Sequence, residues 1–372
     1  MNFTSEGAAT VEWLPYKPDV VLPPGDTLLE TIEAIGLTQK ELATRTGLSA
    51  KHINQIVKGD APLTHETAVL LERVTGIGAR FWNALESEFR DSLARSATAE
   101  VPSVANEWLK SFPLPHLRAL GVINATMREP EALVEQLLEF FGVASIAAWR
   151  ALWANPEVAY LKSPSLESIS GAAAAWLRLG EIEAQRAECE PYDRDRLKAA
   201  LPALRALTPL PTAIAIPQAV ELAAACGVAV VLIPEVPGAR ASGATRWASP
   251  SKAVVQLSDR GKRSDKIWFA FFHELAHVLL HGKRDYFFDE EIGEDSTDAK
   301  EVEANEYART LLVPREFETL LESAKSASDV RSIARQLGVA PSVIAGRLQR
   351  DRSDFRFAST VFESFKIEDL EP

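Results

Sequence analysis

Two histidines four residues apart, with a glutamate directly after the first, are the residues of this chain best suited to chemistry. They lie in FAFFHELAHVLLHG, residues 269–282, whose other side chains are mostly apolar. On an α-helix, residues four apart project from one face, so the imidazoles of His273 and His277 converge. Two neutral imidazoles so placed suit Zn²⁺, and Glu274 can reach a water on the ion and take its proton. The motif therefore predicts a zinc hydrolase centre in which Glu274 is the catalytic base.

A third metal ligand is expected on a second helix further along the chain. His281 is too close on the same helix to complete a tetrahedron with the first pair, and we expect it to end that helix. The stretch KEVEANEYARTLLVP, residues 300–314, offers Glu301 and Glu303 instead. We favour Glu301, because Asn305 shares its helix face and can orient Glu301 or a histidine ligand by a hydrogen bond. Glu303 stays open as the alternative, and a solvated acidic helix start would explain either glutamate without a metal.

The elements that must position these residues include short strands before the motif helix. VAVVLIP (228–234) and KAVVQLS (252–258) are apolar runs of strand length, separated by a glycine-containing hairpin region. We expect the second strand to form the edge of the cleft and to bind substrate by strand addition. Tyr286 and Tyr307 are the candidates for stabilising the oxyanion of the transition state.

A second motif lies near the N-terminus. LTQKELATRTGLSAKHINQIVKG, residues 37–59, has the pattern of two helices joined by a glycine-containing turn, with Thr38 and Ser49 at the N-cap positions. The second helix should present polar and basic side chains to the base edges and phosphates of a DNA major groove. These side chains are Lys51, His52, Asn54, Gln55 and Lys58.

Charge limits the strength of that DNA contact. Residues 25–95 contain eight Lys and Arg against ten Asp and Glu, a net charge of −2. Because phosphate neutralisation supplies non-specific affinity, binding to random DNA should be weak, and docking onto another protein is the alternative use of this domain. A pseudo-palindromic operator would require a homodimer, since two recognition helices must lie one DNA turn apart.

Length and composition indicate a multidomain intracellular protein. The chain has 372 residues, 47% of them hydrophobic, a formal net charge of −12 and only two cysteines. Without a signal peptide, a disulfide framework or an apolar run long enough to span a bilayer, we expect a cytoplasmic protein with no membrane contact. We divide it into an N-terminal extension (1–24), a helix-turn-helix domain (25–95), a helical linker domain (96–211) and a peptidase domain with a C-terminal helical element (212–360).

These motifs carry a resemblance to two known families. Residues 212–350 resemble the ImmA/IrrE zinc metallopeptidases through AVELAAACGVAVVLIP, SGATRW, KAVVQLS, FAFFHELAHVLLHG and EVEANEYARTLLVP, and residues 25–95 resemble XRE/HigA-type repressor and antitoxin domains. The resemblance implies a zincin-like (gluzincin) fold, zinc held by His273, His277 and Glu301, and catalysis by Glu274. It also implies limited proteolysis of a helix-turn-helix repressor, in a stress-response or toxin–antitoxin setting. The stretch 329–351 resembles a second, degenerate helix-turn-helix, which we expect to pack on the core.

The expected fold is mainly α with a small mixed sheet: an all-α helix-turn-helix domain, a helical middle region and an α+β peptidase domain. The expected function is that of a zinc-dependent endopeptidase with its own DNA-binding domain, which regulates transcription by cleaving a repressor or antitoxin-like protein. The alternative is a DNA-binding regulator or antitoxin whose peptidase fold serves as a sensor or scaffold. The intact Glu274 favours the enzyme, because a scaffold has no need of the base.

Overall fold

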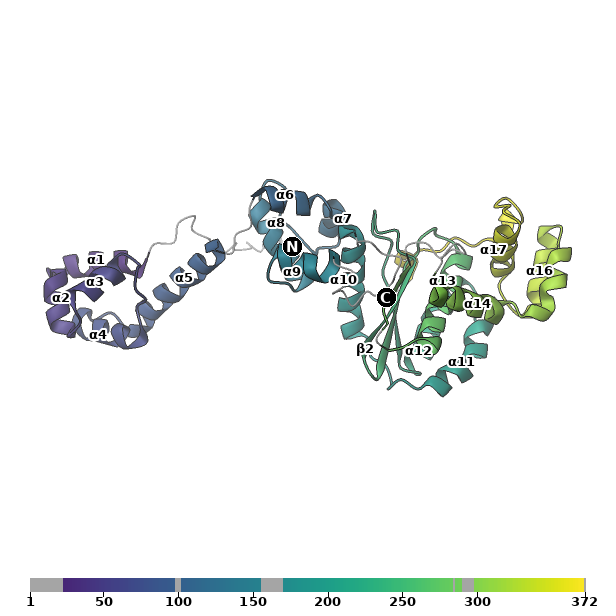
Figure 1. The fold of residues 1–372 in the computed structure, drawn as a ribbon, viewed down its shortest axis with the longest axis horizontal. Helices are drawn as coiled ribbons and strands as arrows, with labels where there is room; N and C mark the ends of the chain where they lie inside the picture. The colour runs from purple at the N-terminus through teal and green to yellow at the C-terminus, as the bar shows by residue number, and fades with distance from the viewer. Residues whose placement is uncertain (1–22, 98–101, 155–169, 284, 290–297, 371–372) are drawn as a thin grey trace, which may run out of the picture. The chain divides into compact units, whose positions relative to one another are not determined.

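The computed structural model describes residues 23–97, 102–154, 170–283, 285–289 and 298–370 (Figure 1). The chain divides into two compact units, Met1–Ala99 and Glu100–Pro372. The described residues are mainly helical with one small mixed sheet of four strands, as the sequence predicted. All but the last two residues of the predicted N-terminal extension, 1–24, lie outside the described part of the chain.

The first unit consists of five described helices around one small core. They are α1 (Pro24–Ala34), α2 (Gln39–Thr46), α3 (Ala50–Val57), α4 (His65–Thr75) and α5 (Ala79–Ala97). Thr38 and Ser49 cap α2 and α3 as predicted: Thr38 forms a reciprocal capping box with Glu41, and Ser49 accepts a hydrogen bond from the backbone N–H of His52. Such caps stabilise a helix start by about 1 kcal/mol, which fixes the turn between the two helices.

Apolar side chains at helical spacing hold this unit together. Leu42, Ile53 and Ile56 are fully buried, and Trp82 of α5 completes the same core. Gly25 allows α1 to approach α3 closely, because a Cβ at this position would lie 2.3 Å from the Cα of Val57. Burying the apolar face of α3 leaves its other face to solvent.

The second unit begins with helices from the region expected to be a linker domain. They are α6 (Pro102–Leu109), α7 (Leu114–Ala119), α8 (Pro130–Phe141), α9 (Ile146–Trp149) with a following π-turn (Arg150–Ala154), α10 (Gly171–Arg186) and α11 (Arg194–Ala206). The first four pack around Trp108, Phe112, Phe141 and Trp149, whose rings meet mostly edge to face. The next two helices, α10 and α11, pack onto the sheet and its covering helices, so residues 171–206 share the core of the peptidase region.

A four-stranded mixed sheet lies at the centre of the second unit (Figure 1). Its strands are β1 (Val228–Leu232), β2 (Gly243–Ser249), β3 (Lys252–Leu257) and β4 (Phe287–Asp289), in the order β1-β3-β2-β4. The strand pair β1 and β3 is parallel, and β2 runs antiparallel to both β3 and β4. Residues of α10 pack on one face of β1 and β3, while α12 (Thr212–Ala224) and α13 (Ser264–Leu280) cover the other.

The expectation that residues 252–258 form the edge of the cleft is wrong. The strand β3 lies inside the sheet, with β1 paired to one side and β2 to the other. The backbone groups of β3 are therefore already engaged and cannot receive a peptide strand. The strands β2 and β3 form an antiparallel hairpin. In the sheet, β2 lies between β3 and the short strand β4, although it comes before β3 in the sequence.

The remaining helices of the second unit pack against α13 or against one another. They are α14 (Ala299–Leu312), α15 (Glu318–Ser323), α16 (Ala327–Leu337) and α17 (Pro341–Asp351), with short 3₁₀ turns at Arg315–Phe317, Ser359–Val361 and Ile367–Asp369. The apolar face of α17 joins the core that contains α13, which confirms the expectation that residues 329–351 pack on the core. Within the described residues no single helix is long and apolar enough to cross a membrane, although the bent pair Pro130–Phe141 and Ile146–Trp153 passes the same test jointly.

Candidate metal centre

The motif helix α13 is buried along most of its length. Its sequence, SDKIWFAFFHELAHVLL, places apolar side chains on every face, and His273, Glu274 and His277 are 0–1% exposed. Three titratable groups in such surroundings are costly unless they are paired or bind an ion. The partners come from α14 and β2, which lie against α13.

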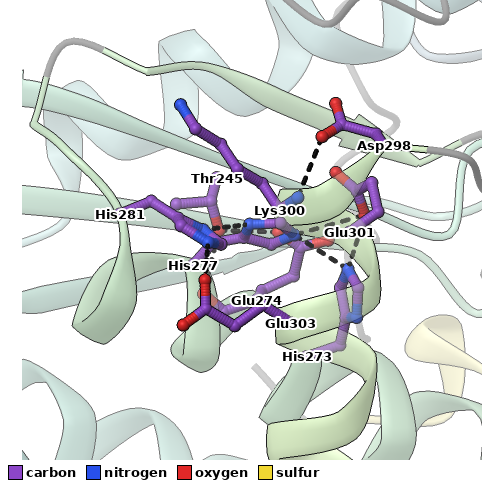
Figure 2. A network of polar contacts seen from close by, with 9 residues as sticks. All are labelled: Thr245, His273, Glu274, His277, His281, Asp298, Lys300, Glu301 and Glu303. Carbon is purple, nitrogen blue, oxygen red and sulfur yellow. Dashed lines mark hydrogen bonds and ion pairs between the residues drawn. The ribbon is translucent and has the colours of Figure 1, made fainter.

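Glu301 of α14 meets both histidines of the motif (Figure 2). Its Oε2 lies 3.2 Å from Nε2 of His273 and 3.4 Å from Nε2 of His277, and the two Nε2 atoms are 2.9 Å apart. The side chain of Asp298 caps α14, and Glu301 lies in the first turn after that cap. Two imidazoles and a carboxylate thus converge, with one ligand atom from each within 4.8 Å of the others.

Glu303, the alternative ligand, lies elsewhere. Its side chain is 61% exposed and its Oε2 is 3.3 Å from Nε2 of His281. Asn305 is buried one turn after Glu301 on the same helix, and its role in orienting the ligands stays a prediction. The geometry therefore favours Glu301 over Glu303 as the third ligand.

The protonation states suit a metal ligand set. Burial lowers the pKa of His277 to about 4, and its hydrogen bond with Glu301 opposes this only in part. Burial would raise the pKa of Glu301, but hydrogen bonds with His273 and His277 hold it well below its usual range. Near neutral pH the site thus holds a neutral imidazole at His277 beside a carboxylate anion. This donor set, of two nitrogens and one oxygen, is one that zinc accepts at a catalytic centre.

His281 ends α13 as predicted, and it also touches the motif. Its Nδ1 lies 2.9 Å from Nδ1 of His277, while its Nε2 faces Glu303. A carboxylate only accepts hydrogen bonds, so a neutral His281 donates from Nε2 to Glu303 and accepts at Nδ1. With a metal bound, His277 would then donate from Nδ1, and the lone pair of its Nε2 would bind the ion in place of the hydrogen bond with Glu301.

Glu274 is held by β2. The hydroxyl of Thr245 donates to Oε2 of Glu274 at 2.6 Å and also lies 3.1 Å from the Glu274 backbone oxygen. Gly243 passes directly over the same carboxylate, because a Cβ there would lie 2.1 Å from Oε1. The candidate base therefore depends on a hydroxyl and on a missing side chain, both from β2 and both on one face of that strand.

A phenylalanine of β4 covers the cluster. The ring of Phe287 stacks on the imidazole of His277 with centroids 3.8 Å apart and an interplanar angle of 22°. Tyr286, one residue earlier, is buried in the core shared with α10, and burial raises its pKa. The charge of Glu274 adds a smaller contribution to that rise in pKa, so Tyr286 lies near the candidate base. Tyr307 is half-buried and packs against the core around α13. A role of Tyr286 or Tyr307 at the oxyanion stays a prediction.

The predicted DNA-contacting residues lie on α3 and at its end. Ile53 and Ile56 face the core, so the intervening side chains point outward. Lys51, Asn54 and Lys58 are exposed, and His52 and Gln55 are half-buried. This is the outward face that the sequence predicted.

Comparison with protein families finds a match in each of two regions of the chain. Residues 229–349 match the family model described as the IrrE N-terminal-like domain, a peptidase family, and residues 28–82 match a helix-turn-helix model. No curated protein matches the chain. The resemblance found in the sequence is confirmed: an XRE-type helix-turn-helix domain precedes an IrrE/ImmA-like domain. The chain thus has a helix-turn-helix domain, which implies DNA binding, followed by a domain similar to a metallopeptidase family.

Several residues at the site were not found from the sequence. Thr245 and Gly243 lie about thirty residues before Glu274 in an ordinary strand, and only the hairpin geometry brings them to it. In the sequence, nothing distinguishes Phe287 from the other apolar residues near it. For His281 the spacing of four from His277 was a usable signal, since residues so spaced share a helix face.

Proposed function

We propose that this protein is a zinc-dependent endopeptidase with its own DNA-binding domain, and that it regulates transcription by limited proteolysis of a helix-turn-helix repressor. The observation that carries the proposal is the convergence of His273, His277 and Glu301 beside Glu274. A structural polar cluster would require the first three residues at most. A carboxylate fixed next to them by Thr245 is what hydrolysis requires in addition.

In this proposal His273, His277 and Glu301 hold the metal. When bound, zinc supplies a Lewis acid that polarises the peptide carbonyl and makes a water acidic enough to be deprotonated near neutral pH. Glu274 accepts the proton of the attacking water on its carboxylate and passes it to the nitrogen of the leaving amine. Thr245 keeps Oε2 of Glu274 in place during both transfers, and general-base catalysis of this kind contributes about 10²–10⁴ in rate.

The DNA-binding part of the proposal rests on the first unit. Lys51, His52, Asn54, Gln55 and Lys58 are offered as the DNA-contacting residues, with a pseudo-palindromic operator and a homodimer. The amides of Asn54 and Gln55 suit adenine edges, and the two lysines suit phosphates. The protein substrate is proposed to be a repressor or antitoxin-like protein related in fold to this first unit.

A second candidate is a DNA-binding regulator in which the peptidase fold is a sensor or scaffold. The complete burial of Glu274 and His273 favours it, because a peptide cannot reach groups that are 0% exposed. The two candidates differ in what Glu274 does.

The discriminating experiment uses the full chain loaded with zinc and the helix-turn-helix repressor encoded next to its gene. We expect the parent to cleave the repressor at one site and Glu274→Gln to retain zinc and fold but lose cleavage. A parent that binds zinc and leaves the repressor intact, with an unchanged transcriptional response in the Glu274→Gln strain, would establish the scaffold instead.

A further inference from the structure

One face of β2 lies directly against the candidate base Glu274. Thr245 and Gly243 contact Glu274 from this strand, and β3 pairs with its inner edge. An extended peptide that is to reach Glu274 by strand addition must use the outer edge, since exposed backbone N–H and C=O groups at a sheet edge are what captures a strand.

That edge is already paired with another part of the same chain. The antiparallel strand β4 places Phe287 opposite Thr245, Phe288 opposite Ala244 and Asp289 opposite Gly243. Paired residues across two strands point to the same face. Phe287 therefore points toward the candidate catalytic residues. Its ring stacks on the imidazole of His277, and its centroid lies 5.0 Å from that of the His281 ring.

Two further contacts fix the segment that leads into β4. The ammonium group of Lys283 donates to the backbone oxygen of Pro250 at 2.6 Å and lies 4.5 Å from the ring of Trp247, beyond the other end of the paired region. Asp285 forms an ion pair with Lys300 of α14 at 2.8 Å. The pairing itself spans three residues, and the contacts of Lys283 and Asp285 lie outside it.

We propose that β4 occupies the place of the peptide substrate on β2, so that an extended segment of the substrate must displace it before hydrolysis. The proposal rests on the proposed function, because it treats β2 as part of an endopeptidase cleft. The substrate segment should carry a large apolar side chain where Phe287 lies, since that position is bounded by the faces of two imidazoles. With β4 in place, the enzyme is latent.

The alternation of β4 sets a second requirement on the substrate. Phe288 points to the opposite face, where it is 4% exposed and lies 6.2 Å from Trp176. Displacing β4 uncovers this aromatic contact, which is unfavourable unless the incoming strand brings an apolar residue to the same place. The substrate segment that can replace β4 is therefore an extended one with two consecutive large apolar side chains, one for each face of the sheet.

Strand exchange, the replacement of β4 on β2 by an added peptide, can be measured without metal or hydrolysis. The probe is a fluorescent synthetic peptide, Asp-Tyr-Phe-Phe-Asp, which has the sequence of residues 285–289. A tethered strand competes at an effective concentration on the order of millimolar, so the parent chain should bind this peptide weakly. A Phe287→Ala/Phe288→Ala chain should bind it at least about 10-fold more tightly. The same peptide with alanine at both phenylalanine positions is the matched control and should not bind.

A reversible disulfide between β2 and β4 tests the same proposal if the double alanine variant folds poorly. Ala244 and Phe288 face each other across the antiparallel pair, a spacing that suits a disulfide. In an Ala244→Cys/Phe288→Cys chain that also carries Cys189→Ser, the oxidised form should not bind the peptide and the reduced form should. Equal binding by the two forms, or no binding by a folded double alanine chain, would overturn the proposal. If the peptide exchanges as expected but the reduced, zinc-loaded chain cleaves nothing, the endopeptidase function fails while the strand exchange stands.

Discussion

The Nδ1 atoms of His277 and His281 lie 2.9 Å apart, and Nε2 of His281 faces Glu303. If His281 donates from Nε2 to Glu303, this chain of contacts favours a proton on Nδ1 of His277 and leaves its Nε2 for a metal ion. Partners of this kind on a ligating histidine typically change metal affinity by about 10–100-fold.

His281→Ala should therefore weaken zinc binding by about 10–100-fold while leaving the stoichiometry at saturation unchanged. Competition with a chelating dye on the full chain gives the affinity. Glu303→Gln is the matched variant, and its effect should be smaller, because the Glu303 side chain is 61% exposed. Unchanged affinity in His281→Ala would show that the Nδ1 contact does not orient His277.

Thr245→Val should lower kcat about 10-fold or more with little change in KM, since general-base efficiency depends on the position of Glu274. Valine has nearly the shape of threonine but cannot donate to the carboxylate. Thr245→Ser keeps the hydroxyl and should restore most of the activity. A serine variant as impaired as the valine variant would mean that the hydrogen bond alone does not account for the effect of Thr245.

The stability of the metal-free protein should fall as the pH drops from about 6.5 to about 4. In the folded protein the pKa of His277 is about 4, so the imidazole stays neutral until the pH falls to about that value. In the unfolded chain its pKa is the ordinary 6.5, so it takes up a proton at a higher pH. Between these values the unfolded state binds more protons, so the free energy of unfolding decreases by up to about 1.4 kcal/mol per pH unit. Urea unfolding at several pH values with chelator present measures this slope. His277→Gln, which cannot take up the proton, should show a shallower slope, and an equal slope would assign the effect to other groups.

Asn54→Ala/Gln55→Ala should abolish the preference for the operator, at about 1–3 kcal/mol per lost base contact. Lys51→Ala and Lys58→Ala should instead weaken binding to all DNA and flatten its salt dependence. Anisotropy titrations against the protein's own promoter and random DNA, at two salt concentrations, separate these effects. Binding to the promoter no tighter than to random DNA would favour a protein-docking role for α3.

The sequence could predict the elements whose signals are local. The capped helices α2 and α3 follow from Thr38, Ser49 and the apolar spacing around them, and the two histidines of α13 follow from a spacing of four residues. The partner glutamate could be placed on α14, and Asn305 on the same helix face favoured Glu301 over Glu303. Only the packing of α14 on α13 shows how far each of the two glutamates lies from the histidines.

What could not be predicted depends on how strands associate. The order β1-β3-β2-β4 places β3 inside the sheet, and nothing in KAVVQLS distinguishes an inner strand from an edge strand, since both are apolar runs. Strand β4 is three residues long, too short to produce a recognisable alternation. The positions of Phe287, Thr245 and Gly243 at the site all depend on that pairing.

The most direct test of the metal centre is the zinc content of matched variants of the full chain, purified without chelator and measured by elemental analysis. We expect one zinc per chain in the parent and in Glu303→Ala, and a large loss of zinc in Glu301→Ala and in His273→Ala. Zinc retained in Glu301→Ala and lost in Glu303→Ala, or a parent free of zinc that fails to bind it when supplied, would contradict the assignment of His273, His277 and Glu301 as the ligands.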